Sequence, residues 1–178
     1  MENAVRELRG EEVAPDIEPE IRLGISAYFP DDYIPDVNQR LFFYKRLASL
    51  RNPLELEEIK EEIRDRFGPY GAAVGNLFLV MNLRRVLKEF LVQQISASDG
   101  RVFLLFHPQS AVKIEKLLEL INKPKSRFRL APDGRLSFSP KNEEWEMLVI
   151  EVEELLYSLY GPAMNLAASS EPLHDRAM

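Results

Sequence analysis

Residues 36–90 decide the fold, and they read DVNQRLFFYKRLASLRNPLELEEIKEEIRDRFGPYGAAVGNLFLVMNLRRVLKEF. Apolar residues recur there at every third or fourth position, which is the spacing of helices that pack on a core. Asp36 precedes the first apolar run as an N-cap would, and Asn52-Pro53 places a cap before a proline at the first helical position. Gly68 is the residue type that commonly follows a helix. The stretch therefore predicts three helices, over about 36–51, 53–68 and 71–90.

The third helix is predicted to lie at the centre of the fold. Its apolar residues occupy most of the circumference, and a helix that is apolar nearly all round is normally buried. These residues are Val74, Leu77, Phe78, Met81, Leu83, Val86, Leu87 and Phe90. On the first helix, Leu41, Tyr44 and Leu47 share one side and are expected to face this centre.

Ahead of the helices, residues 20–29 read EIRLGISAYF and alternate between apolar and polar side chains. Alternation of this kind places every second residue on one face of an extended chain. The apolar set is Ile21, Leu23, Ile25, Ala27 and Phe29. The pattern predicts a half-buried strand over 20–29.

Two turn signals follow the helices, Asp99-Gly100 and Pro132-Asp133-Gly134. Each lies between two short apolar runs, which is typical of a β-hairpin. The strands are predicted over 91–95 and 102–106 and over 128–130 and 136–138, with helices over about 109–121 and 142–159. The fold class is therefore α+β: a cluster of three helices packed with a small, mostly antiparallel sheet of two hairpins plus the N-terminal strand.

The domain organisation follows from changes in composition along the chain. Residues 1–19 contain a short helical pattern and then two prolines, as expected for the end of a preceding helix and a linker. Residues 20–160 form one α+β domain, and residues 161–178 are small and polar, as in a disordered tail.

Composition limits the environment and the partners. The 178 residues include no cysteine, which fits a reducing cytoplasm. No run of about 18 apolar residues predicts a membrane span, and the N-terminus lacks the apolar centre of a signal peptide. The net charge of −6 repels phosphate backbones, so nucleic-acid binding would need a local basic patch.

Motifs for catalysis and for ligand binding are missing. The sequence contains neither of the glycine-rich loops that hold nucleotide phosphates and no GxSxG elbow. His107 and His174 are far apart in sequence, and Asp31, Asp32 and Asp36 lack the spacing of a calcium loop. We therefore predict no catalytic residue, no cofactor site and no metal site in this chain.

Charge is segregated on the helix predicted over 53–68. Glu58, Glu62 and Asp65 lie on one flank of its apolar side, and Lys60 and Arg64 lie on the other. Several acidic residues repel one another at i,i+4, and Glu62 with Arg66 is the opposite-charge pair at that spacing. Such segregation suits docking on a basic protein surface. The alternative is a helix face that is simply solvated.

A basic set is also present. Arg84, Arg85 and Lys88 lie on the third helix, and Lys125, Arg127 and Arg129 lie near the second hairpin. The latter three could contact phosphate, although Phe128 is the one aromatic residue among them that could stack on a base.

Two long segments are similar to a known family. PDDYIPDVNQRLFFYKRLAS at 30–49 and LELEEIKEEIRDRFG at 54–68 resemble the C-terminal domain of the bacterial transcription-repair coupling factor. The likeness extends over about residues 2–159, and ENAVRELRG at 2–10 looks like the end of the helix that leads into that domain.

The resemblance implies a regulatory role within a larger protein. The parent is expected to be an ATP-dependent DNA translocase, with ATP and Mg in an upstream motor, that displaces stalled RNA polymerase and recruits excision repair. In the family this domain packs against the N-terminal module that binds the damage-recognition ATPase and masks it. The match to EIRDRFG implies that Glu62 and Asp65 make that contact. The alternative is an accessory module that contacts DNA or polymerase during translocation.

Overall fold

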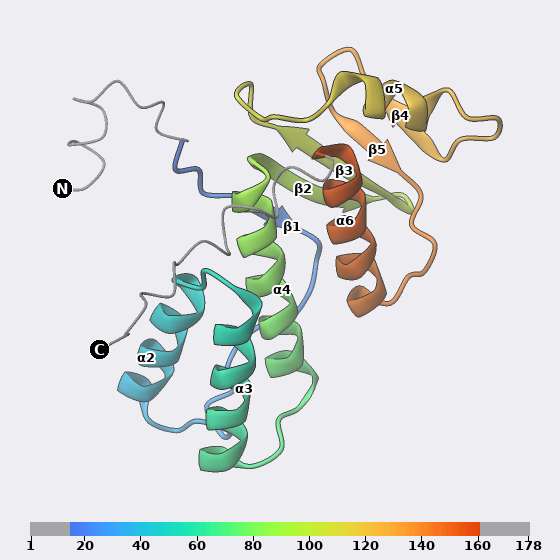
Figure 1. Cartoon of the computed structure of the whole chain (residues 1–178). Coiled ribbons are helices and arrows are strands. Elements are labelled where there is room, and N and C mark those ends of the chain that lie inside the picture. Colours follow the sequence, from blue (N-terminus) through green and yellow to red (C-terminus); the bar gives the residue numbers. More distant parts are fainter. Residues whose placement is uncertain (1–14, 161–178) are drawn as a thin grey trace, which may run out of the picture.

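The computed structural model describes residues 15–160 (Figure 1). Most of the predicted linker, and all of the predicted tail at 161–178, lie outside this range. In chain order the elements are β1 (Glu20–Arg22), α2 (Val37–Ala48), α3 (Pro53–Phe67), α4 (Ala72–Glu89), β2 (Val92–Ser98), β3 (Arg101–Phe106), α5 (Ile114–Ile121), β4 (Phe128–Leu130), β5 (Leu136–Phe138) and α6 (Trp145–Tyr160). The α+β class predicted from the sequence is confirmed.

Helix α4 is shared by two hydrophobic cores. Its first half contributes Val74 and Phe78 to a core formed with α2 and α3. Its second half contributes Val86 and Leu87 to a core formed with the sheet and α6. Figure 1 shows α4 running from the helical part of the molecule to the sheet, with α6 beside it. The predicted central position of this helix is confirmed.

The predicted helix caps are present. The Asp36 Oδ1 accepts a hydrogen bond from the Gln39 N–H at 3.0 Å, and the Asn52 Oδ1 accepts one from the Glu55 N–H at 3.0 Å. Each bond satisfies a backbone donor that the helix itself leaves free. Gly68 follows α3 with φ at +83°, a conformation that glycine adopts without strain.

The sheet has the order β1-β2-β3-β5-β4, with β1 parallel to β2 and every other pair antiparallel. Both predicted hairpins form, and Asp99 and Gly100 take positive φ at the first turn. The hairpins join edge to edge because β3 pairs with β5, for example through Phe103 and Ser137. The sequence patterns predicted each hairpin but not this junction.

The strand predicted over 20–29 is shorter than expected, because only Glu20–Arg22 pairs with β2. Gly24 follows with φ at +68°, which ends the extended backbone. The chain then runs along α4, where the Tyr28 N–H donates to the Ala73 carbonyl and Asn76 donates to the Ser26 carbonyl. The apolar alternation was nevertheless a correct guide to burial, since Leu23 and Phe29 are buried on these two cores.

Two further predictions need correction. Leu41 was expected to face the core, but it is 51% exposed, and Phe43 with Leu47 forms the buried side of α2. The helix predicted over 109–121 begins only at Ile114. Residues before it bond to other elements instead: the Ser110 hydroxyl donates to the Phe90 carbonyl, and the Lys113 N–H donates to the Leu159 carbonyl.

Candidate protein–protein interface

Helix α3 presents a charged face to solvent because its opposite face is fixed in the helical core. Leu56, Ile59 and Ile63 are buried there, as the apolar spacing predicted. The exposed positions of α3 include Leu54 and three acidic residues that we call the acidic stripe: Glu58, Glu61 and Asp65. Successive members of this row are three or four residues apart, so they form one line along the helix.

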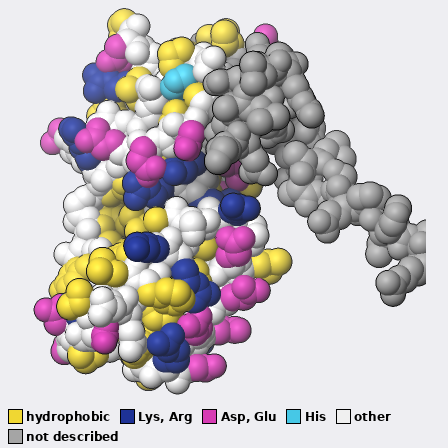
Figure 2. All heavy atoms as spheres, turned by 90° about the vertical axis from the view of Figure 1, so that its left-hand side faces the viewer, with side chains coloured by type: hydrophobic (Ala, Val, Ile, Leu, Met, Phe, Trp, Pro, Cys, Tyr) yellow, Lys and Arg dark blue, Asp and Glu magenta, His cyan; other side chains and the backbone are white. Residues whose placement is uncertain are grey.

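The acidic stripe lies on an accessible part of the surface. Its three carboxylate residues are all exposed. Figure 2 shows Asp and Glu side chains gathered along one side of the helical part of the molecule. Leu54, which is 74% exposed, places an apolar side chain at the N-terminal end of the same row.

Glu62 has a different role from the stripe. Its carboxylate forms an ion pair with Arg46 of α2 and accepts a hydrogen bond from Arg66 at 2.8 Å. The hydrogen bond from Arg46 is the main reason that the pKa of Glu62 lies below its usual value. Both arginines also lie over the Phe43 ring, so this group fastens α2 to α3.

The predicted interface residues therefore separate into two groups. Glu58 and Asp65 are exposed on the acidic stripe, whereas Glu62 and Arg66 bind each other and α2. Glu61 was not among the predicted interface residues, although its helical spacing from Glu58 and Asp65 is the signal that identifies it.

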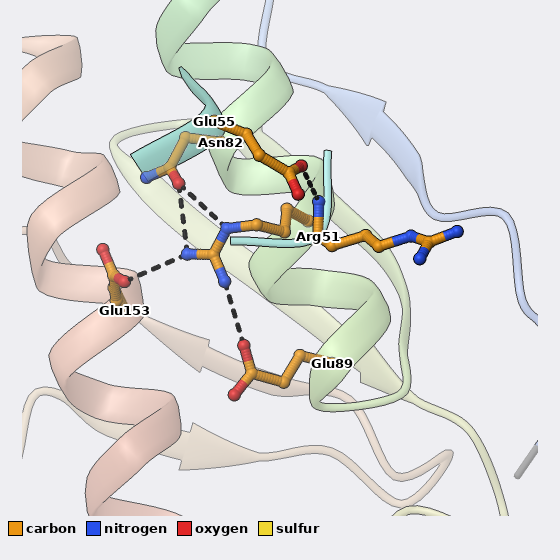
Figure 3. Close-up of polar contacts among 6 residues, drawn as sticks. Arg51, Glu55, Asn82, Glu89 and Glu153 are labelled. Atoms are coloured by element: carbon orange, nitrogen blue, oxygen red, sulfur yellow. Dashed lines mark hydrogen bonds and ion pairs between the residues drawn. The ribbon is translucent and has the colours of Figure 1, made fainter. Parts of the chain in front are cut away.

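A hollow of about 330 Å³ lies next to the acidic stripe, between the end of α2 and the start of α3. It is lined by Arg46, Ser49, Arg51, Glu55, Glu58 and Ile59. The Glu55 carboxylate accepts a hydrogen bond from the Arg51 N–H at 2.8 Å, as Figure 3 shows. The rim is polar and the hollow is open, so it resembles the edge of a contact surface more than a site for a small molecule.

The basic residues near the second hairpin do not act as one group. Lys125 and Arg129 are exposed. Arg127 is an ion-pair partner of the buried Glu151, donates to the Ser139 carbonyl at 2.7 Å and lies over the Phe128 ring. Arg127 thus joins the sheet to α6, and a phosphate contact would have to rest on the other two residues.

The basic residues of α4 are also engaged within the domain. Arg85 is buried, and Figure 3 shows Asn82, Glu89 and Glu153 converging on its guanidinium. This group ties α4 to α6, so Arg85 is not a free member of the basic set in which its sequence position grouped it with Arg84 and Lys88.

Arg84 and Lys88 of the same helix both bind Glu18, which belongs to the lead-in segment, residues 15–19. The hydrogen bond from Lys88 is the main cause of a pKa of Glu18 below its usual value. The lead-in segment is therefore held on α4 by charge.

Side chains that could hold a metal ion do not come together between residues 15 and 160, where no three His, Cys, Asp or Glu residues form a cluster. Across the same residues, no helix combines the length and the apolar character that crossing a membrane requires.

Fold and surface define a class: a small α+β domain that is built around one long shared helix and that presents a charged helical face outward. Comparison with known proteins identifies the family within this class. The model of the TRCF domain family matches residues 23–117, and the chain belongs to that family. The resemblance seen in the sequence is confirmed.

Relatives and a solved structure agree with this assignment. The transcription-repair-coupling factor of Myxococcus xanthus is 29% identical over 94% of this chain, and that of Haemophilus influenzae is 38% identical over 67% of it. The chain spans only 14% and 10% of the length of these two relatives. A crystal structure of the C-terminal domain of transcription-repair coupling factor matches with a TM-score of 0.67 at 26% identity, over 80% of this chain and 94% of that one.

Proposed function

We propose that this chain is an autoinhibitory interaction domain of a transcription-repair coupling factor. It masks the N-terminal module that recruits the damage-recognition ATPase of excision repair. The observation that carries the proposal is the acidic stripe of α3, in which Glu58, Glu61 and Asp65 all face solvent. A row of exposed carboxylates fits a basic protein surface and steers its approach.

The contact is weak enough to open. Exposed ion pairs contribute about 0–1 kcal/mol each, so three carboxylates alone make a modest interface. Within one polypeptide the two surfaces meet at an effective concentration of about millimolar, which keeps a modest interface closed. A change elsewhere in the protein can then release it by favouring the open state by a few kcal/mol.

Glu62 supports the surface indirectly. Its ion pair with Arg46 of α2 holds α3 against α2, so the orientation of the acidic stripe is fixed, and its ion pair with Arg66 within α3 holds the carboxylate in place. Because its carboxylate already has two cationic partners, we assign the direct contact to Glu58, Glu61 and Asp65 and the positioning of the helix to Glu62.

The proposal extends to the longer protein. The parent is an ATP-dependent DNA translocase whose motor holds ATP and Mg outside this domain, and it displaces stalled RNA polymerase. When the motor engages polymerase and duplex DNA, the domain moves away and the N-terminal module becomes free to bind the ATPase. The names of the relatives, which join transcription to repair, support this role.

A binding experiment tests the contact. The chain is titrated with the separately produced N-terminal module of the same factor at increasing salt, and the dissociation constant is measured by calorimetry. Glu58→Lys combined with Asp65→Lys should weaken binding about tenfold or more, since two attractions become repulsions. The matched control, Glu115→Lys with Glu119→Lys on α5, makes the same change in net charge elsewhere and should leave the affinity almost unchanged. Equal affinities for all three proteins would contradict the assignment.

A second candidate function is a DNA- or polymerase-contacting accessory module. The exposed Lys125 and Arg129 at the second hairpin favour it. It predicts that the chain retards duplex DNA in a gel at low salt and that Lys125→Glu with Arg129→Glu abolishes the shift. Absence of any shift with the unaltered chain would dispose of direct DNA contact by this hairpin.

A further inference from the structure

Among residues 15–160, no element packs on the outer face of α6. Six apolar side chains on its inner face are buried in the core shared with the sheet: Leu148, Val149, Val152, Leu155, Leu156 and Leu159. On the opposite face Met147 is 45% exposed, Ile150 is 43% exposed and Tyr157 is 37% exposed. Their spacing of three and seven residues places them in one row along the helix. We call this row the α6 stripe.

Acidic residues lie within and beside the α6 stripe. Between Asn142 and Tyr160 the chain carries six glutamates and no lysine or arginine. Glu146 and Glu154 lie on the same outer face, both exposed, and neither has an ion-pair partner among residues 15–160. By helical spacing Glu154 falls within the row, between Ile150 and Tyr157, and Glu146 lies beside it, so this face combines apolar and negative side chains.

The α6 stripe is held in place before anything binds it. The Tyr157 ring packs edge-on against Phe90 with the ring centroids 4.8 Å apart. Arg85 of α4 binds Glu153 of α6, which fixes the rotation of the helix (Figure 3). A surface that is already ordered costs less entropy on binding than one that must be ordered.

Charge decides what kind of partner fits. Two copies of this face would bring Glu146 and Glu154 of each copy together, and like charges in an interface are unfavourable. Nucleic acids and anionic lipids are repelled for the same reason. A helix that carries apolar anchors with lysine or arginine side chains near them complements both the apolar and the negative side chains of this face.

We propose that the outer face of α6 is a docking surface for a basic amphipathic helix of a protein partner. Met147, Ile150 and Tyr157 bind its apolar side, and Glu146 and Glu154 pair with its cations. The site is separate from the acidic stripe, because Figure 1 shows α6 beside α4 and away from α2 and α3. Residues 15–160 thus present a second acidic face besides the acidic stripe, and on α6 the acidic side chains accompany three exposed apolar ones.

The probe is a synthetic helix of about five turns with leucines on one face and lysines beside them. Backbone amide shifts of the full chain, followed by NMR during a titration, locate the contact. We expect the shifts to concentrate on residues 146–157. Glu146→Lys with Glu154→Lys should weaken binding about tenfold, and Ile150→Gln should weaken it about threefold or more.

Two controls decide the outcome. The variant Glu115→Lys with Glu119→Lys on α5 changes the net charge equally and should bind the probe within about twofold of the unaltered chain. A peptide with glutamates in place of the lysines should not bind. The proposal is overturned if both double variants lose affinity equally, if the shifts spread over all acidic faces, or if the chain alone dimerises through α6.

Discussion

At the scale of single residues, the structure separates charges that look alike in the sequence. Glu58 and Glu62 are one turn apart, yet the first faces solvent and the second binds Arg46 and Arg66. The difference arises because Arg46 belongs to another helix, and a helical wheel contains no information about neighbouring helices. Sequence spacing could therefore identify the acidic flank but could not tell which of its members was already engaged.

Glu62→Gln is predicted to lower the free energy of unfolding by about 0.5–1 kcal/mol at neutral pH, since it weakens partly exposed ion pairs. The pKa of Glu62 is lowered in the folded state, so its stabilisation is present above the unfolded pKa and is lost as pH falls through the folded pKa. The difference between the two proteins should therefore shrink as the pH is lowered below about 4, the ordinary range of a glutamate.

Urea unfolding at several pH values measures this difference. Glu61→Gln is the matched control, because the neighbouring residue is exposed; it should change stability by less than about 0.5 kcal/mol. A constant difference between Glu62→Gln and the unaltered chain from acid to neutral pH would contradict the assigned role of Glu62.

At the scale of elements, local sequence signals correctly predicted the helix caps and the hairpins. They did not predict which strands pair when those strands are far apart in the sequence. Asp36 and Asn52 cap their helices as their residue types indicate, and both hairpins form at their glycine-containing turns. The junction of β3 with β5 depends on how the two hairpins pack beneath α6. The turn residues contain no information about that packing. The shortening of the first strand depends on the backbone of Gly24, which alternation of side chains does not reveal.

Two glycine-to-alanine substitutions should change the stability of the domain in opposite directions, and they test the backbone conformations at Gly24 and in α4. Gly24 has φ at +68°, so Gly24→Ala should destabilise the domain by about 1 kcal/mol although a Cβ there meets nothing within 4 Å. Gly75 lies inside α4, and a Cβ there meets the Tyr70 ring at an ordinary 3.8 Å. Gly75→Ala should therefore stabilise the domain by about 0.5–1 kcal/mol. Thermal unfolding measures both, and stabilisation by Gly24→Ala would contradict the strained conformation.

At the scale of the whole molecule, α4 makes two cores depend on one element. The helical core and the sheet core each bury one half of that helix. Neither core can lose α4 without disturbing the other, so residues 15–160 should unfold in one cooperative transition.

Phe78→Ala provides the test, because it removes a buried ring from the helical core while Trp145 packs against the sheet core. The substitution should cost about 3–5 kcal/mol. Trp145 fluorescence and far-ultraviolet circular dichroism should shift together and report the same midpoint. If the fluorescence midpoint stays where it was while the circular dichroism moves, the two cores unfold separately.

The fastening of the lead-in segment to α4 has a mechanical consequence. Force applied to the chain ahead of Pro15 acts first on the ion pairs of Glu18 with Arg84 and Lys88. It acts next on β1, the three-residue strand at the edge of the sheet. Surface ion pairs and the pairing of a three-residue strand break at lower force than a packed hydrophobic core. Under force we expect the lead-in segment and β1 to detach first, which lengthens the chain by a few residues. Both hydrophobic cores should remain folded at that force.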